Sequence, residues 1–336
     1  FHQGAKSNGQ FSPMLHGYLL YQSALRKGNL HRIEVNLCRQ IAERTLKQRP
    51  FENYTLSMLD HHQCHAEAAY RTQDKDRCLV LTLDAMGDGL SATAWRGEGA
   101  RLHPLWNQSG MSAMSMFYSR VTEILGYKPL RHEGKITGLA ALAEAPTALV
   151  EHFQQAVRFE NGRFNRVNIW KPSTQSDAFW SKCTDYSPAE VASAAQLVLE
   201  RNMCAFVEHW VQQTGLSDVV VGGGVFANVK MNQRLVALDC VDSLWVLPHM
   251  GDGGLAAGAA YLSGATRFNW QPKTIDTMML GPSIQTNATD IHQFVQSKPL
   301  QSNRVDSEEA TSRVVQALIN DQIVARATGR LEYGPR

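Results

Sequence analysis

The sequence has few cysteines, no CxxC motif and no long hydrophobic run. Its six cysteines are scattered over 336 residues. This spacing argues against a disulfide framework and against a zinc ribbon, and we expect reduced thiols in a cytoplasmic protein. Apolar runs fall short of the roughly 18 residues that span a bilayer. No signal peptide opens the chain either, so we expect no membrane association.

The chain also has no large net charge of either sign. The 33 basic and 31 acidic residues leave a formal net charge of +2. Nucleic-acid binders need a basic surface, so we do not expect a nucleic-acid partner. Any phosphate-bearing ligand must therefore be held by local features. The sequence leaves the oligomeric state open, with a homodimer as one option.

A hydrophobic content of 43% is enough for a large core in a chain of this length. Apolar periodicity and turn residues predict alternating helices and strands. The predicted helices cover residues 13–46 with a break near Gly28, 61–71, 112–127, 187–215, 225–238, 255–262 and 307–320. The predicted strands cover residues 54–59, 78–84, 90–95, 101–106, 218–221, 243–247 and 322–327.

One helix has clear end signals. Ser187 can be its N-cap, Pro188 suits its first position, and Glu190 completes a capping box. Gly215 fits a C-terminal cap, so the helix can run over the whole interval.

The order of these elements predicts an α/β protein with two lobes. Gly97-Glu98-Gly99 separates two short strands and predicts a hairpin, hence a meander in the first half. Strands and helices alternate in the second half. The polar stretch at 160–185 is the expected boundary, which puts the lobes at residues 1–170 and 171–336.

The segment His61-His62-Gln63-Cys64-His65 is the first candidate site. Side chains four residues apart lie on one face of a helix, so His61 and His65 can reach one ion. His62 and His65, three apart, are an alternative pair, and a histidine-rich surface turn without a ligand is another. Two imidazoles suit iron, zinc, nickel or copper.

Two aspartates follow buried strands and lie in glycine-rich turns. Asp84 precedes Gly87-Asp88-Gly89, and Asp252 lies in the segment Gly251-Asp252-Gly253-Gly254. Sites in open α/β sheets form beyond strand ends, so both carboxylates are candidate metal ligands opposite the histidine pair. The alternative is that Asp84 or Asp88 caps a turn and that Asp252 caps a helix.

Two further segments are candidates for contact with a phosphate. Gly222, Gly223 and Gly224 separate a strand from a helix, where exposed N–H groups suit a nucleotide. No GK[ST] follows, so this is not a Walker A loop, and a tight turn is the alternative. Lys135, between two glycines, can reach a phosphate or carbamoyl oxygen, and a solvated charged loop is the alternative.

Taken in order, these motifs resemble the conserved blocks of the carbamoyltransferase family of the nodulation and antibiotic-tailoring type. Seven blocks in one family's order are far more specific than any one of them. Between residues 60 and 336 the matching blocks are HHQCHAEAAY, LTLDAMGDGLSA, MFYSRVTEILGY with HEGKITGLAAL, VVVGGGVFANVKMN, LPHMGDGGLAAGAA, LGPSI and GRLEYGPR.

The resemblance implies an actin-like, sugar-kinase-like fold, similar to the tRNA threonylcarbamoyl transferase subunit, in which two ribonuclease-H-related lobes close over a nucleotide. It also implies the chemistry. A separate domain joins carbamoyl phosphate to ATP, which yields carbamoyl adenylate. The actin-like domain then passes the carbamoyl group to a hydroxyl of a small molecule such as a sugar or an antibiotic.

The resemblance further implies which residues act. One divalent metal is expected at His61, His65, Asp84 and Asp252, with iron as first choice and manganese or zinc as alternatives. Such an ion orients a phosphate and stabilises leaving-group charge. Lys135 is the candidate catalytic residue. The expected nucleotide contacts are Gly87, Asp88, Gly89, Gly222, Gly223, Gly224, Asn228 and Asn232.

Parts of the family pattern are not visible in the sequence. The N-terminal strand, with a His-Asp pair that serves the acceptor hydroxyl, is not found, so the general base has no candidate. The carbamoyl-adenylate-forming domain is not found either. The chain begins at Phe1 and ends inside the block GRLEYGPR. We therefore expect a part of a longer protein, or dependence on a partner for activation.

Two other functions fit the same residues. One is a related carbamoyl transfer on this fold, to tRNA or to a hydrogenase maturation protein. The other is a non-catalytic, nucleotide-binding protein of the actin-like fold. Weak basic character argues against tRNA, and a tightly bound metal at His61 and His65 would argue against a non-catalytic role.

Overall fold

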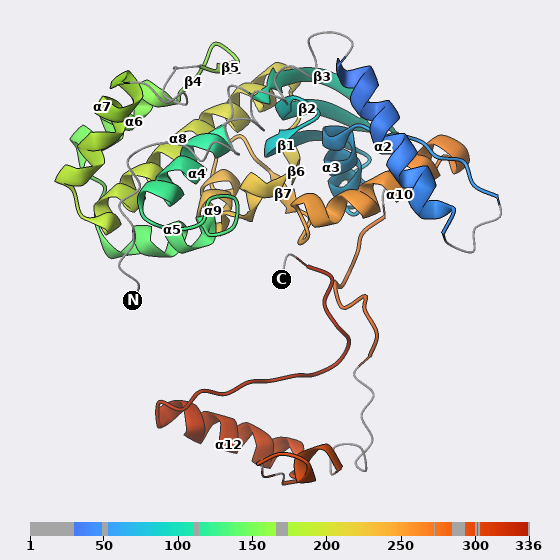
Figure 1. Ribbon diagram of the computed structural model, residues 1–336, viewed down its shortest axis with the longest axis vertical. Helices are drawn as coiled ribbons and strands as arrows, with labels where there is room; N and C mark the ends of the chain where they lie inside the picture. The colour runs from blue at the N-terminus through green and yellow to red at the C-terminus, as the bar shows by residue number, and fades with distance from the viewer. Residues whose placement is uncertain are drawn as a thin grey trace. The chain divides into compact units, whose positions relative to one another are not determined.

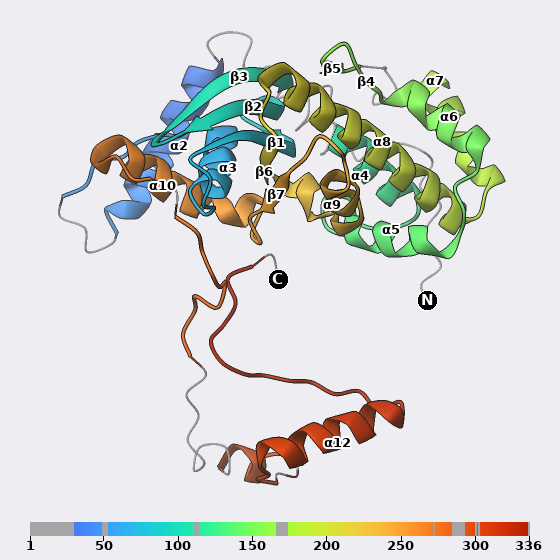
Figure 2. The same ribbon diagram turned by 180° about the vertical axis from the view of Figure 1, so that it is seen from behind.

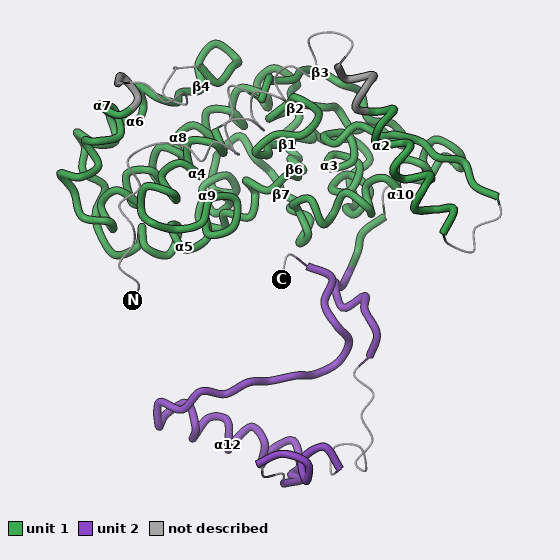
Figure 3. Tube along the Cα trace, in the orientation of Figure 1, with its two compact units in different colours: residues 1–275, 335 green, residues 276–334, 336 purple. Residues whose placement is uncertain are grey.

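The computed structural model describes residues 30–48, 53–110, 114–165, 174–271, 273–283, 293–299, 301 and 303–334. The chain forms two compact units, one up to Ile275 and the other Asp276–Gly334 (Figure 3). The helix predicted over residues 13–46 is present as α2 (Leu30–Leu46). Its first part and the break near Gly28 lie outside the described residues.

A five-stranded sheet forms the centre of the first unit, in the order β3-β2-β1-β6-β7 (Figure 1). The first three strands form the predicted antiparallel meander, and β6 and β7 continue the sheet parallel to β1. This mixed sheet with helices on its faces confirms the predicted α/β class. The strands are β1 (Arg77–Gly87), β2 (Leu90–Glu98), β3 (Arg101–Ser109), β6 (Asp218–Gly222) and β7 (Ser243–Val246).

The central strand β1 is buried on both faces, as its continuous apolar run requires. Leu79, Leu81 and Leu83 belong to the main core, together with α8 (Pro188–Thr214). Thr82 points to the opposite face because successive side chains of a strand alternate. There it contacts α3 (His61–Tyr70), against which α10 (Leu255–Phe268) packs (Figures 1 and 2).

The end signals of α8 are confirmed. The Ser187 side chain accepts a hydrogen bond from the Glu190 backbone, and the Glu190 carboxylate accepts one from the Ser187 backbone. Pro188 is the first helical residue, and Gly215 ends the helix at φ 66°. The helix packs its aromatic side chains onto β3, where Trp106 contacts Phe206 and Trp210.

Several other helices of this unit pack around α8. Among the described residues, α5, α6 and α9 pack against it, and α4 packs against both α8 and β1. The helix predicted at residues 225–238 is divided, because Asn228 caps a new helix after a 3₁₀ turn, Gly224–Ala227. The bounds are α4 (Met114–Ile124), α5 (Glu133–Leu139), α6 (Thr147–Ala156) and α9 (Val229–Val236).

The polar stretch at 160–185 is more regular than its composition predicts. A short hairpin, β4 (Phe159–Glu160) and β5 (Arg163–Phe164), and helix α7 (Thr174–Ser181) lie in or beside it. Buried Phe164 and Trp180 hold it to the core. The boundary expected at residue 170 falls inside the first unit, where β1 from one side of it pairs with β6 from the other.

Two predicted strands are wrong. Residues 54–59 and residues 322–327 form neither strand nor helix. Residues 54–58 alternate apolar and polar residues and residues 322–327 are mostly apolar, yet Tyr54 and Met58 are exposed and Ile323 is fully exposed. Such patterns stabilise a strand only when a neighbouring strand and a core accept it.

The second unit contains the predicted C-terminal helix as α12 (Ser307–Ile319). The Asp306 side chain caps it by accepting a hydrogen bond from the Glu309 backbone N–H at 2.9 Å. A single bridge pairs Ser283 with Arg330. In the part of the chain that the structure describes, no helix is both long enough and apolar enough to cross a membrane.

Candidate metal centre

Helix α3 brings His61 and His65 to one point, as their spacing predicts. Asp60 starts the helix by accepting a hydrogen bond from the Gln63 backbone N–H at 2.9 Å. The Nε2 atoms of His61 and His65 lie 3.1 Å apart. His62 points into the sheet instead, where it contacts Thr82 and the Leu90 carbonyl. The structure therefore selects the pair four residues apart.

Asp84 meets this pair from the end of β1. Its Oδ2 lies 3.0 Å from His65 Nε2 and 3.3 Å from His61 Nε2. The ladder between β1 and β2 is irregular after Leu83, so Asp84 lies in a bulge. Bulges re-aim side chains beside functional sites. Here Ser115 of α4 donates a hydrogen bond to the Asp84 carbonyl at 2.8 Å, which holds this stretch of backbone.

Asp252 completes the cluster from the turn before α10. Its Oδ1 lies 3.5 Å from His65 Nε2 and 3.6 Å from His61 Nε2. The four side chains thus offer ligand atoms within 4.8 Å of one another. His65 is 1% exposed and Asp252 is 73% exposed, so the cluster is closed on the α3 side and open to solvent on the Asp252 side.

This cluster fits a single metal ion. Ligand atoms bound at about 2.0–2.2 Å around one ion are about 3.0–3.5 Å apart in tetrahedral or octahedral geometry. The separations between His and Asp atoms run from 3.0 to 3.6 Å. Two imidazoles and two carboxylates suit iron, zinc or manganese. The open side leaves room for ligands other than protein.

Hydrogen bonds within the cluster stabilise the charged forms of Asp84 and His65 against the effect of burial. Burial alone would raise the pKa of Asp84, but hydrogen bonds with His61 and His65 hold that pKa well below its usual range. Burial opposes the His65 imidazolium, yet hydrogen bonds with Asp252 and Asp84 raise the His65 pKa. Asp84 is therefore held as an anion, which is the form that binds a cation.

The predicted nucleotide segment Gly87-Asp88-Gly89 forms the turn between β1 and β2. Gly87 pairs with Leu90, and Asp88 and Gly89 have φ values of 50° and 76°. Two positive φ values are typical of a type I′ hairpin turn. Asp88 Oδ2 also accepts a hydrogen bond from the His61 backbone N–H at 2.8 Å. A Cβ atom on Gly87 would lie 2.1 Å from the His61 ring. Gly87 and Asp88 therefore position His61, a predicted metal ligand, and sequence reasoning missed this role.

The triple-glycine turn lies beside the same cluster. Gly223 has φ 101°, and a Cβ atom there would lie 2.2 Å from the Leu83 carbonyl oxygen. A Cβ atom on Gly224 would lie 3.2 Å from Asp84 Oδ1, and one on Gly222 would lie 2.9 Å from the His65 carbonyl oxygen. The turn thus needs glycine for close packing against β1 and α3. Contact with a nucleotide stays a prediction.

Asn228 and Asn232 differ in the hydrogen-bonding groups that their side chains keep available for a ligand. Asn228 is buried, caps α9 through Met231 N, and exchanges amide hydrogen bonds with Gln196. Its second amide hydrogen goes to Thr137, so its side chain is used within the fold. Asn232 donates to the Phe226 carbonyl at 2.7 Å, while its buried Oδ1 has no hydrogen-bond partner among the described residues. Only Asn232 retains an acceptor for a ligand.

Lys135 is exposed on α5, with its ammonium group 5.6 Å from the centre of the Tyr127 ring. No hydrogen bond or ion pair in the described chain joins it to the four cluster residues. Its neighbour Thr137 is anchored by Tyr118 and Asn228. The structure therefore fixes the helix that carries Lys135, and its predicted catalytic role is untested.

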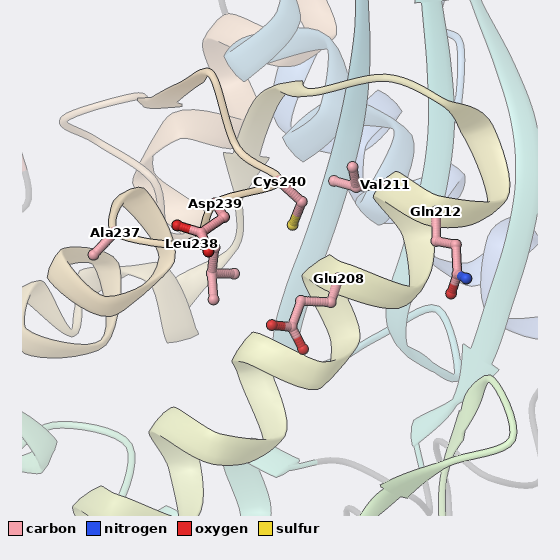
Figure 4. A pocket seen from close by; sticks show the side chains of 7 residues that line it. All are labelled: Glu208, Val211, Gln212, Ala237, Leu238, Asp239 and Cys240. Carbon is pink, nitrogen blue, oxygen red and sulfur yellow. The ribbon is translucent and has the colours of Figure 1, made fainter.

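A separate pocket of about 550 Å³ opens between α8 and the residues after α9 (Figure 4). None of the predicted site residues lines it. Burial and the nearby Glu208 raise the pKa of Cys240, so this thiol stays protonated at neutral pH. Its lining residues are Glu208, Val211, Gln212, Ala237, Leu238, Asp239 and Cys240.

Comparison with known families gives a single domain assignment. Residues 18–261 match the family model described as carbamoyltransferase N-terminus. This interval covers most of the chain and contains all four residues of the candidate metal cluster.

Several curated proteins are similar to this chain. An uncharacterised protein of Synechocystis is 26% identical over 82% of the chain and 48% of its own length. Nodulation protein NolNO of Sinorhizobium fredii is 24% identical over 84% of the chain and 42% of its own length. Nodulation protein NolO of Bradyrhizobium diazoefficiens is 25% identical over 83% of the chain and 51% of its own length. The chain spans about half the length of these relatives.

Two solved structures of HypF are also similar. HypF of T. kodakarensis matches with a TM-score of 0.45 and 13% identity, over 69% of this chain and 39% of that one. A full-length HypF in the phosphate- and nucleotide-bound form matches with a TM-score of 0.46 and 13% identity, over 66% of this chain and 45% of that one.

Proposed function

Because the chain belongs to the carbamoyltransferase family, we propose that it transfers a carbamoyl group from carbamoyl adenylate to a hydroxyl of a small molecule. The observation that carries this proposal is the convergence of His61, His65, Asp84 and Asp252 on one point. The small-molecule acceptor follows from the resemblance to carbamoyltransferases of the nodulation type, and two nodulation proteins are similar over more than four-fifths of the chain.

We propose that a metal ion held by the four residues also binds oxygen atoms of the nucleotide. A bound divalent ion would orient a phosphate oxygen and stabilise the negative charge that develops on the leaving nucleotide. His65 and Asp84 form the closed side of the cluster, and the exposed Asp252 leaves the other side to solvent and substrate. Iron is our first choice of metal, with manganese or zinc as alternatives.

Transfer consists of one bond made and one broken. The acceptor oxygen bonds to the carbamoyl carbon, and the bond from that carbon to the phosphate oxygen of AMP breaks. The hydroxyl proton passes to a base. The triple-glycine turn lies against Asp84, and its lack of side chains lets the adenylate approach the cluster there, with Asn232 Oδ1 as an additional acceptor. The Gly223 N–H donates to the Met250 carbonyl at 2.8 Å and is therefore not offered to the adenylate.

We further propose that the sheet belongs to one ribonuclease-H-like lobe of an actin-like fold. Three antiparallel strands followed by two parallel ones, with α3 on one face and α8 on the other, support this assignment. Strands from residues 1–170 and from residues 171–336 both contribute to it.

The activity can be tested with hydroxyl-bearing acceptors, carbamoyl phosphate and ATP, in parallel reactions with and without a carbamoyl-adenylate-forming domain from a relative. We expect an acceptor whose mass increases by one carbamoyl group, and no product with His65→Ala. His152→Ala, which replaces a buried histidine of α6 outside the cluster, is the matched control and should retain activity. Carbamoylation of amines alone, or full activity of His65→Ala, would contradict the proposal.

A further inference from the structure

His62, between the two histidines of the cluster, is fully buried and makes its hydrogen bonds outside the cluster. Its Nδ1 lies 2.7 Å from the Thr82 hydroxyl, and its Nε2 lies 3.1 Å from the Leu90 carbonyl oxygen. A carbonyl oxygen only accepts, so Nε2 carries the proton and Nδ1 accepts from Thr82. The side chain of His62 therefore ties α3 to β1 and to β2.

The hydrogen bond from Thr82 is the last of a directed series. Trp95 Nε1–H donates to the Thr93 hydroxyl at 2.6 Å. Since Thr82 uses its own hydrogen on His62, the Thr93 hydroxyl must donate to Thr82. Each donor in the series thus has one available acceptor, and the series fixes the side-chain orientation of His62.

This series connects the two elements that carry three of the cluster residues. His61 and His65 flank His62 on α3, and Asp84 follows Thr82 by two residues on β1. A rotation or shift of α3 would move both Nε2 atoms away from Asp84, and it would also break both hydrogen bonds of His62. The contacts of His62 therefore oppose the motion that would open the cluster.

We propose that His62 and Thr82 are positioning residues that set the metal affinity of the cluster without contacting the metal. The inference rests on the proposed metal centre. It extends the role of the HHQCH segment, because the histidine that is not a ligand becomes the one that aligns the other two.

Thr82→Val and Thr82→Ser test this role as a pair. Valine keeps the shape of threonine but removes the hydroxyl, whereas serine keeps the hydroxyl. Metal affinity would be measured by competition with a coloured chelator, using Mn²⁺ and Zn²⁺, and the melting temperature would be recorded for every variant. We expect Thr82→Val to weaken binding by about tenfold or more, as loss of an outer contact does at other metal sites. Thr82→Ser should bind as the wild type does.

His152→Gln is the matched control for a purely structural effect. His152 is also a buried helical histidine bonded to a carbonyl, Phe179 O at 2.9 Å, but it lies on α6. We expect this variant to melt at a lower temperature with unchanged metal affinity. Trp95→Phe removes the outermost donor of the series. It should weaken metal binding less than Thr82→Val does. If Thr82→Val does not fold, Trp95→Phe tests the positioning role in its place.

The outcomes separate the two proposals. If the wild type binds no metal, the proposed metal centre fails. If the wild type binds one ion and Thr82→Val and Trp95→Phe bind it equally well, only the positioning role is rejected. A loss of affinity in Thr82→Val that Thr82→Ser restores supports the positioning role.

Discussion

Asp84→Ala is expected to weaken metal binding far more than Asp252→Ala. Asp84 is 13% exposed, and its Oδ2 lies within 3.3 Å of both histidine nitrogens. Asp252 is 73% exposed and more distant from both, so water can replace its carboxylate. We expect a loss of at least about 100-fold for Asp84→Ala and about tenfold for Asp252→Ala, given that even outer contacts are worth 10–100-fold.

Equilibrium dialysis of both variants against Zn²⁺ and Mn²⁺ measures this difference. Asp60→Ala is a useful control, because Asp60 caps the same helix through Gln63 N but is not one of the cluster residues. It should lower stability slightly and leave one ion bound. Equal losses for Asp84→Ala and Asp252→Ala would contradict the account of a cluster closed on one side.

Arg71→Met is expected to lower the free energy of unfolding by about 3–5 kcal/mol, the usual cost of removing one partner of a buried ion pair. Arg71 and Glu67 are 1% and 3% exposed, with 2.7 Å between Nε and Oε2. Arg71 also donates to the carbonyl oxygens of Trp270 and Ala100, both at 2.7 Å. Burial raises the pKa of Glu67, and Arg71 opposes that rise. Methionine would leave a buried carboxylate and two carbonyls without their donor.

Arg313→Met provides the matched control. Arg313 and Glu309 form an ion pair of the same spacing at 2.6 Å, but they are 55% and 48% exposed. Such surface pairs contribute about 0.3–0.5 kcal/mol. Urea unfolding of both variants gives the comparison. The double variant Glu67→Leu, Arg71→Met should recover part of the loss, since no buried charge remains. Equal effects of Arg71→Met and Arg313→Met would show that the Arg71 pair is not structurally important.

The sequence predicted the elements that have both an apolar pattern and a clear end signal. Helix α8 follows its capping box and Gly215, and the meander follows Gly97-Glu98-Gly99. Residues 54–59 and 322–327 have the pattern without a partner, and no local signal records whether a neighbouring strand exists. The parallel pairing of β1 with β6 joins residues on either side of residue 170. Composition does not report such long-range pairing, so it gave no check on the boundary expected there.

The convergence of the four predicted metal ligands was the most predictable part of the site. Helical spacing identified His61 and His65, and strand ends followed by glycine identified Asp84 and Asp252. The supporting residues were not predictable in the same way. The contact of Asp88 with the His61 backbone depends on how a hairpin turn meets α3. Asn228 looked available to a ligand, but its amide is used by Gln196 and Thr137, which are distant in sequence.

Metal content and ligand type of the wild-type chain test the central claim most directly. Elemental analysis of the chain loaded with Zn²⁺ gives the number of ions per chain, and X-ray absorption reports the atoms around the zinc. We predict one ion per chain, surrounded by nitrogen and oxygen atoms that include two imidazoles. Cys64 lies between the histidines in sequence, but its thiol is not among the ligand atoms that converge, so we expect no sulfur ligand. No bound ion, or an ion with sulfur in its first shell, would contradict the cluster of His61, His65, Asp84 and Asp252.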